Sequence, residues 1–194
     1  MVLIVQPTAP LLVTERLELW LPTRDDMAAM LAIVTDPHTG RFLGTATSQA
    51  EHFVRFSRNA GSWLLYGYGS FVLRPRGQAT VIGNAGIFHS WRGLGEDFDD
   101  SPEAGWILRY DQTAQGLARE AMEAALAWFT GEHGPMRIVC MIDPANVPSL
   151  RLADRLGFAL LRDARLSDGD EMRLLAREGV PGRPFEDARF RQLG

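Results

Sequence analysis

The chain has 194 residues and a formal net charge of −4, with one cysteine, and all 20 of its basic residues are arginine. The absence of lysine excludes enzymes that depend on a lysine amine, such as pyridoxal-phosphate enzymes, P-loop NTPases and protein kinases. The acidic balance gives no basic face for nucleic acid, no apolar run is long enough for a membrane helix, and a single cysteine allows no intrachain disulfide. These properties favour a one-domain cytoplasmic protein that binds anions through arginine or backbone N–H groups.

Hydrophobic periodicity predicts strands and helices throughout the first half of the chain. The expected elements are a strand at 17–21, a helix from Thr23 to about residue 33, a helix at 48–65 and strands at 70–74 and 80–88. Phe53, Phe56 and Trp63 are expected on the inward face of the second helix. A turn at 75–77 makes the two strands an antiparallel hairpin.

In the second half, a polar loop with four acids precedes a strand–helix–strand unit. The expected elements are a loop at 89–102, a strand at 103–109, a helix at 115–129, a strand at 137–142, a helix at 148–156 and a final hairpin of 158–161 with 172–176. The helix at 115–129 carries a small apolar stripe of Ala118, Ala121, Met122, Ala125 and Phe129. This order predicts an α/β domain with a mixed sheet, in which antiparallel hairpins precede a parallel βαβ unit.

The same pattern sets the expected limits of the domain. We expect an N-terminal extension at 1–12, a single domain at 13–177 and a loosely ordered tail at 178–194, which is rich in Pro, Gly and Arg. The extension and the tail are the segments that we expect to contribute to any homodimer interface.

The junction between the strand at 103–109 and the helix at 115–129 has the layout of an anion-binding loop. The backbone N–H groups in the first turn of a helix are unpaired, and the helix dipole adds partial positive charge there. Gly116 would let the backbone approach an anion closely. A glycine at this place is also typical of helix capping or packing, so both interpretations stay open on this feature alone.

Several motifs resemble the GNAT superfamily of acyl-CoA N-acyltransferases. The segment Thr113-Ala-Gln-Gly-Leu-Ala118 resembles the pyrophosphate loop Gln/Arg-x-x-Gly-x-Gly/Ala, in which Gly116 and Ala118 match and Thr113 departs. The segment from Asn146 to Phe158 resembles the Asn-x-x-Ser…Leu-Gly-Phe pattern of the family. Residues 13–17, 82–83 and 103–106 follow in the order typical of the RimJ/RimL-like branch, which includes enzymes that acetylate ribosomal-protein N-termini. The resemblance spans about residues 13–176.

This resemblance implies a GNAT fold, a central mixed sheet of about six to seven strands flanked by about four helices. It also implies that acetyl-CoA enters between two parallel central strands, with the pantetheine arm on the backbone of 103–109 and the pyrophosphate on the N–H groups of 115–119. The cofactor-binding residues that it implies are Trp106, Ile107, Leu108, Arg109, Gln115, Gly116, Leu117, Ala118, Arg119, Asn146 and Ser149. The four histidines are scattered without ligand spacing, so we expect no metal site.

Direct acetyl transfer requires that an ammonium lose its proton and that the leaving thiolate be protonated or stabilised. The family often uses a tyrosine as the acid, but no tyrosine follows Asn146, so Ser149 is the candidate donor to the sulfur. Asn146 is expected to bind the pantetheine, to cap the helix, or both. Glu103 is the candidate base, with His89 and a water chain as alternatives.

The resemblance therefore predicts an acetyl-CoA-dependent N-acetyltransferase that acts on a primary amine, with a protein N-terminal amine as the leading acceptor. A small-molecule amine is the alternative acceptor. A non-catalytic acyl-CoA-binding module is the alternative function, because of Thr113 and the missing tyrosine. The acceptor cleft is expected at 35–70 and 89–102, where the acids from Glu96 to Asp100 either attract an amine or are simply solvated.

Overall fold

The computed structural model describes residues 7–43 and 48–179, and within them one eight-stranded sheet has the order β1-β2-β3-β4-β5-β6-β8-β7. All neighbouring strands are antiparallel except β5 and β6, which are parallel. The strands are β1 (Leu12–Val13), β2 (Leu17–Trp20), β3 (Ser70–Pro75), β4 (Gly83–Ser90), β5 (Ser101–Leu108), β6 (Ile138–Ile142), β7 (Ala159–Arg165) and β8 (Glu171–Arg177). The mixed sheet with its parallel βαβ unit confirms the predicted fold class.

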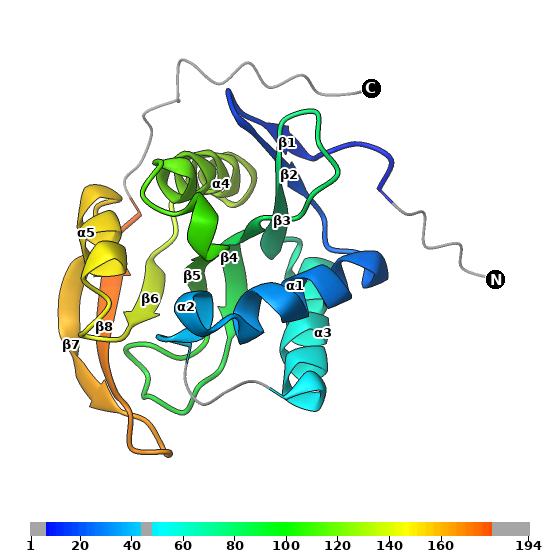
Figure 1. Ribbon diagram of the computed structural model, residues 1–194. Helices are drawn as coiled ribbons and strands as arrows, with labels where there is room; N and C mark the ends of the chain where they lie inside the picture. Colours follow the sequence, from blue (N-terminus) through cyan, green and yellow to red (C-terminus); the bar gives the residue numbers. More distant parts are fainter. Residues whose placement is uncertain (1–6, 44–47, 180–194) are drawn as a thin grey trace.

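Five α-helices surround this sheet in the described residues (Figure 1). They are α1 (Met27–Thr35), α2 (Pro37–Gly40), α3 (Gln49–Tyr66), α4 (Leu117–His133) and α5 (Val147–Arg155). The counts exceed those expected by one strand and one helix, for local reasons. Leu12 and Val13 pair with β2 as the short strand β1. The side chain of Asp36 accepts hydrogen bonds from two backbone N–H groups, and this cap starts the single turn of α2.

The sheet separates two apolar clusters that hold the helices in place. On one face, the α4 side chains of Ala121, Met122, Ala125 and Phe129 are fully buried, as the predicted stripe requires. Ala118 is only half-buried, and its neighbour Leu117 takes the buried place at the start of the helix. On the other face, α1 packs onto Val81 and Ile107. Side chains of β5 therefore alternate between the α4 face and the α1 face.

The predicted inward face of α3 is wrong at one position. Phe53 is 56% exposed, whereas the neighbouring His52 is 3% exposed and lies against the backbone oxygen of Met27 in α1, 3.2 Å from its Nε2. Loss of hydration lowers the pKa of His52, so this ring stays neutral where a charged ring would be costly. The polar contact sets the rotation of α3, and apolar periodicity alone does not show it.

The remaining boundaries differ at strand and helix ends, and α4 runs to His133 rather than to residue 129. β4 and β5 extend toward each other until Ser90 pairs with Ser101, so the polar loop that joins them is shorter than the expected 89–102. No helix in residues 7–43 and 48–179 is long and apolar enough to cross a membrane. Most of the tail expected at 178–194, and the first half of the extension at 1–12, lie outside the described residues.

Candidate active site

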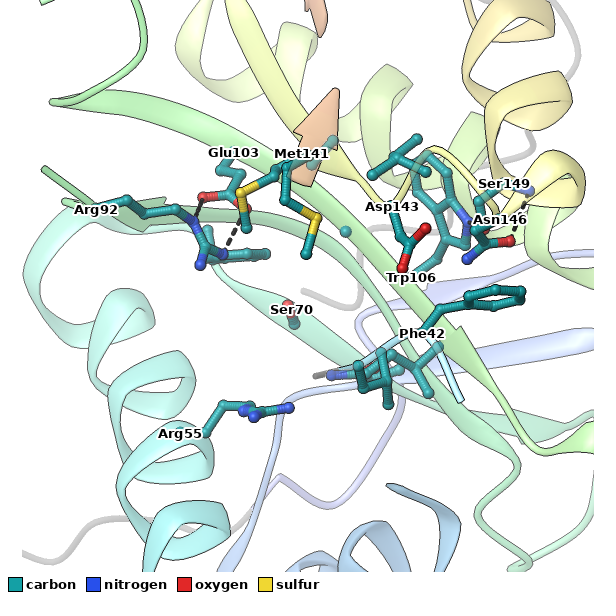
Figure 2. Close-up of a pocket in the computed structure, with 18 of the residues that line it drawn as sticks. Phe42, Arg55, Ser70, Arg92, Glu103, Trp106, Met141, Asp143, Asn146 and Ser149 are labelled. Atoms are coloured by element: carbon teal, nitrogen blue, oxygen red, sulfur yellow. Dashed lines mark hydrogen bonds and ion pairs between the residues drawn. The ribbon is translucent and has the colours of Figure 1, made fainter. Parts of the chain in front are cut away.

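The sheet opens between its two parallel strands. β5 and β6 share one register pair, Glu103 with Val139, among the described residues, whereas β5 pairs with β4 along its whole length. Beyond that pair, residues 104–107 of β5 and 141–143 at the end of β6 line a cavity of about 370 Å³ (Figure 2). Backbone groups of β5 are thus exposed to the cavity, where an extended amide-bearing chain can pair with them as a strand would.

One wall of this cavity joins β5 to the start of α5. The indole N–H of Trp106 donates a 3.2 Å hydrogen bond to Oγ of Ser149. The side-chain oxygen of Asn146 accepts a bond from the Ser149 backbone N–H, which makes Asn146 the N-cap of α5. Asn146 and Ser149 both line the cavity and lie beside Trp106 in Figure 2. The capping role expected of Asn146 is confirmed, and its amide nitrogen is left for a ligand.

The start of α4 has the backbone geometry of an anion cradle. Gly116 is the N-cap with φ +79°, a left-handed conformation that favours glycine, and no side chain caps the first turn. The N–H groups of Leu117, Ala118 and Arg119 are therefore available to a phosphate. Thr113, which departs from the family pattern, donates its hydroxyl to the carbonyl oxygen of Tyr110 at 2.7 Å and so stabilises the loop from within.

Arg16 brings a positive charge to the same loop, which the sequence did not reveal. Its Nη1 donates to the carbonyl oxygen of Gln115 at 2.9 Å, and its Nε donates to Glu120 at 2.7 Å. Thr14 donates to the other carboxylate oxygen of Glu120 at 2.6 Å. Burial alone would raise the pKa of Glu120, but the hydrogen bonds from Thr14 and Arg16 outweigh it and lower that pKa. The turn between β1 and β2 thereby fixes the first turn of α4.

The predicted cofactor residues fall into two groups. Trp106, Ile107, Asn146 and Ser149 line the cavity together with the predicted base Glu103. The others lie outside the cavity lining, from the end of β5 to the first turn of α4, and comprise Leu108, Arg109, Gln115, Gly116, Leu117, Ala118 and Arg119. The two arginines of this second group are ion-paired: Arg109 binds Asp111 at 2.6 Å, and Arg119 binds Glu123 at 2.7 Å.

Glu103 lies at the point where the two strands part. Its side chain is 4% exposed, and its carboxylate accepts two hydrogen bonds of 2.6 Å from Arg92, as well as one from the Ser90 hydroxyl. Figure 2 shows this bidentate pair at one end of the cavity. A carboxylate held by three donors can accept a proton only by loosening one of them, so Glu103 combines a suitable position with a restrained geometry.

The cavity is also lined by charged residues that the sequence did not point to. Arg55 and Arg58 both belong to α3, and Figure 2 shows Arg55 on the same side of the cavity as Arg92. Asp143 follows the last residue of β6. Desolvation and the positive charge of Arg92 lower the pKa of the Arg55 and Arg58 guanidiniums, although arginine stays charged at any neutral pH. Asp143 was recognisable as the residue that leaves the predicted central strand, but the α3 arginines belong to no motif.

His89 does not reach the cavity. It lies on the face of β4 that packs toward α4, where Nδ1 is 3.1 Å from the Tyr68 hydroxyl and Nε2 is 3.1 Å from Asp100. Tyr66 stacks on its ring at 3.9 Å. Tyr110 stacks on His38 instead, so none of the three tyrosines lines the cavity. Among the described residues after Asn146, Ser149 is the one whose hydroxyl group lines the cavity.

The acidic loop and the single cysteine both have structural roles. In the acidic loop, Asp97 binds Arg162 at 2.7 and 2.8 Å, and Asp99 accepts from the backbone N–H groups of Arg92 and Gly95. Cys140 is buried in β6, and this burial, followed by the charge of Glu103, raises the pKa of its thiol, so it is an unreactive hydrophobic residue. No cluster of three or more potential metal ligands occurs in residues 7–43 and 48–179.

Comparison with known proteins places this geometry in a family. The acetyltransferase (GNAT) domain model matches residues 16–159. A protein from Bordetella pertussis that is assigned to the GnaT acetyltransferase family is 33% identical, with a TM-score of 0.76 over 86% of this chain and 98% of that chain.

Two more distant structures share the fold. RimL, a ribosomal L7/L12 alpha-N-protein acetyltransferase solved with coenzyme A, is 18% identical with a TM-score of 0.66, over 87% of this chain and 97% of that chain. The Salmonella typhimurium acetyltransferase that modifies the N-terminal serine of ribosomal protein L7/L12 is 18% identical with a TM-score of 0.68, over 88% and 99%. With a domain match over most of its length and a parted pair of parallel strands at its centre, this chain belongs to the GNAT acetyltransferase family.

Proposed function

We infer that this acetyltransferase transfers the acetyl group of acetyl-CoA directly to a primary amine, and that a protein N-terminal amine is the leading acceptor. The observation that carries the inference is the cavity between β5 and β6, which has a hydroxyl donor on one wall and an anionic residue at its end. Structural likeness to RimL, an alpha-N-protein acetyltransferase, supports the protein acceptor. A small-molecule amine is the second candidate, because the cavity is lined on several sides by charged side chains.

The residues present fit acetyl-CoA in three places. The backbone of β5 from residue 104 onward supplies hydrogen-bonding groups for the two amides of the pantetheine arm. The uncapped N–H groups after Gly116 suit the pyrophosphate, and the dipole of the 17-residue helix α4 adds to this attraction. In a chain without lysine, Arg16 and Arg119 offer guanidinium donors beside this turn, although each is also paired with a glutamate of α4.

The cavity wall at Ser149 suits the leaving group. When the amine nitrogen attacks the acetyl carbonyl carbon, the carbon–sulfur bond breaks and the sulfur leaves with the electron pair. Because Oγ of Ser149 accepts from Trp106, its own O–H proton is directed away from that indole and is available to the thiolate. We assign this donor role to Ser149 as our proposal.

The proton of the acceptor ammonium must leave before attack. We propose Glu103 as its acceptor, directly or through a water molecule, because it lies at the end of the cavity where the strands part. Asp143 is the second carboxylate available in the described cavity wall near Ser149, and its Oδ1 accepts a hydrogen bond from the nearby Ala145 N–H at 2.7 Å. The outcome of Glu103 substitution decides between these groups.

A calorimetric titration of the full chain with acetyl-CoA tests the first step. We expect saturable binding in the micromolar range, on the order of 10 μM, and an absence of heat at high micromolar ligand would contradict both the enzyme and the non-catalytic binding module. Release of the CoA thiol in the presence of N-terminal peptides and small amines then separates the two. Binding without thiol release on any amine would favour the non-catalytic module.

A further inference from the structure

The cavity has oppositely charged side chains on two facing sides. Arg55 and Arg58 of α3 and Arg92 after β4 form one wall, which we call the arginine wall. Figure 2 shows Arg55 and Arg92 on this side and Asp143 across the cavity, beside Trp106 and Ser149.

The turn between β7 and β8 adds Asp168 and Asp170 to the cavity lining. We call the side of the cavity that carries Asp143 the aspartate wall. Among the described residues, none of these three carboxylates makes an ion pair within 4.0 Å. The two walls therefore do not neutralise each other across the cavity, and the separation of charge is left for a ligand to match.

Arg58 adds to the arginine wall a positive charge that no ion pair compensates in the described part of the chain. Glu103 is the carboxylate bound there, and both its oxygens are taken by Arg92. Arg58 has no carboxylate within 4.0 Å in the described part of the chain. Desolvation, and after it the positive charge of Arg92, lowers the pKa of Arg55 and Arg58, and the Arg92 contribution reflects repulsion between guanidiniums at this wall.

Resting on the function proposed above, we propose that the acceptor carries a carboxylate besides its amine, and that the arginine wall binds this carboxylate while the amine points to Asp143 and Ser149. A carboxylate matches the planar, forked donors of arginine, which bind it in a bidentate way. The ammonium is attracted to the aspartate wall, which lies on the side of the hydroxyl donor. In this orientation its proton passes to Asp143, or to Glu103 through a water molecule. The arrangement thus selects an amino-carboxylate and orients its amine toward the thioester.

An amino-carboxylate acceptor can be a peptide with an acidic side chain near its N-terminus or a free amino acid. Two matched pairs of acceptors distinguish these sources. The first pair consists of the peptide amides Ser-Glu-Ala-Ala-NH₂ and Ser-Gln-Ala-Ala-NH₂, which differ only in one side-chain charge. The second pair is glycine and glycinamide, which represent a free amino acid and its neutral counterpart. For each pair the ratio of kcat/KM, acidic over neutral, is measured by thiol release in the full-length wild type and in Arg58→Gln. Comparing ratios between the proteins cancels differences in amine basicity within a pair.

We expect the ratio of at least one pair to fall about tenfold in Arg58→Gln, as for loss of a charge-assisted hydrogen bond. Arg58→Lys should recover part of the ratio. Arg24→Gln is the matched control, because the side chain of Arg24 is 87% exposed and does not line the cavity. The acceptor pair whose kcat/KM ratio falls shows whether the carboxylate belongs to a peptide side chain or to a free amino acid. Because Arg58 is exposed, we expect unchanged thermal unfolding of Arg58→Gln.

The measurements distinguish failure of the amino-carboxylate assignment from failure of acetyl transfer itself. If wild-type protein acetylates the neutral and acidic members equally well and Arg58→Gln changes neither ratio, the amino-carboxylate proposal is overturned while acetyl transfer to amines stands. If acetyl-CoA binds but no amine, acidic or neutral, is acetylated, the proposed function itself fails and the acceptor assignment fails with it.

Discussion

The indole N–H of Trp106 and the hydroxyl oxygen of Ser149 are joined by a 3.2 Å hydrogen bond across the opening between β5 and α5. This bond fixes the acceptor side of the hydroxyl and leaves its proton for another partner. It also links the strand that we expect to bind pantetheine to the helix that follows the other parted strand. The hydrogen bond therefore holds the Ser149 side chain of α5 in a fixed position relative to Trp106 of β5.

Replacing Ser149 by alanine tests the donor role. We expect kcat to fall about 10- to 100-fold, since the thiolate would leave without a proton donor, and the KM for acetyl-CoA to change little. Steady-state thiol release measures both constants. Trp106→Phe is the control, because it keeps a ring but removes the N–H, and it should cause a smaller loss. An unchanged kcat in Ser149→Ala would remove this residue from the mechanism.

Replacing Glu103 by glutamine tests the proton acceptor. The neutral amide leaves the Arg92 guanidinium, which is 25% exposed, without its ion-pair partner, so we expect unfolding free energy to fall by about 2 kcal/mol. We expect kcat to fall about 100-fold as well, with binding of acetyl-CoA retained in calorimetry.

Arg92→Gln separates the two effects, because it breaks the same pair and keeps the carboxylate. If Glu103 accepts the proton, Glu103→Gln loses more kcat than Arg92→Gln at comparable loss of stability. If Glu103→Gln and wild type acetylate Ser-Gln-Ala-Ala-NH₂ or glycinamide equally fast, the proton goes to Asp143 or to water instead. Asp143→Asn then becomes the decisive variant.

Gly116→Ala is expected to weaken acetyl-CoA binding. The left-handed conformation at φ +79° costs a residue with a Cβ about 1–2 kcal/mol, and relief of that strain would rotate the first N–H groups of α4. We expect the dissociation constant from calorimetry to rise about tenfold, in line with that strain. Gly131→Ala within α4 is the matched control, because no atom lies within 4 Å of the place that the new methyl group would take and the backbone there is helical. Equal affinities for both variants would argue against the cradle.

Glu120 is expected to make stability depend on acid pH. Its pKa is lowered from 4.5 in the folded protein, so its contribution is fully present above about that value and is lost as the pH falls through the folded pKa. Glu120→Gln should lower the unfolding free energy by about 1 kcal/mol at neutral pH. This difference from wild type should vanish in denaturant titrations well below pH 4.5. Glu123→Gln, on the exposed face of α4, should show a smaller difference at neutral pH.

Cys140→Ala is expected to leave turnover unchanged. The thiol is 1% exposed, and its raised pKa keeps it protonated, so it offers no nucleophile for an acyl-cysteine intermediate. The small side-chain loss should cost about 1 kcal/mol of stability. A kcat reduced by more than about tenfold in a folded variant would instead indicate a covalent route.

The elements near the cofactor were largely predictable, because their signals are local. Gly116 between a strand and a helix, and Asn146 before a helix, each act through the backbone of their own segment, and the structure has both as N-caps. The apolar stripe of α4 reflects contact with one flat sheet, which periodicity alone can reveal.

The acceptor side was not predictable, because its geometry depends on contacts between distant segments. Arg92 meets Glu103 only after β4 and β5 pair, and Arg58 reaches the same cavity from α3. His52 rather than Phe53 faces inward because a backbone oxygen of α1 is available to it. His89 lies in β4, one residue before its end, but its side chain lies on the face opposite to the cavity, which strand alternation decides and composition does not.

The single register pair between β5 and β6 also has a consequence for dynamics. A sheet normally confines its unpaired edges to its two sides, but this one carries two further edges in its interior. Native-state hydrogen exchange should therefore be fast at those backbone amides of residues 104–107 that point away from β4, deep within an otherwise protected sheet. A bound pantetheine arm would act as a guest strand there, so occupancy of the site and cooperativity of the whole sheet are coupled.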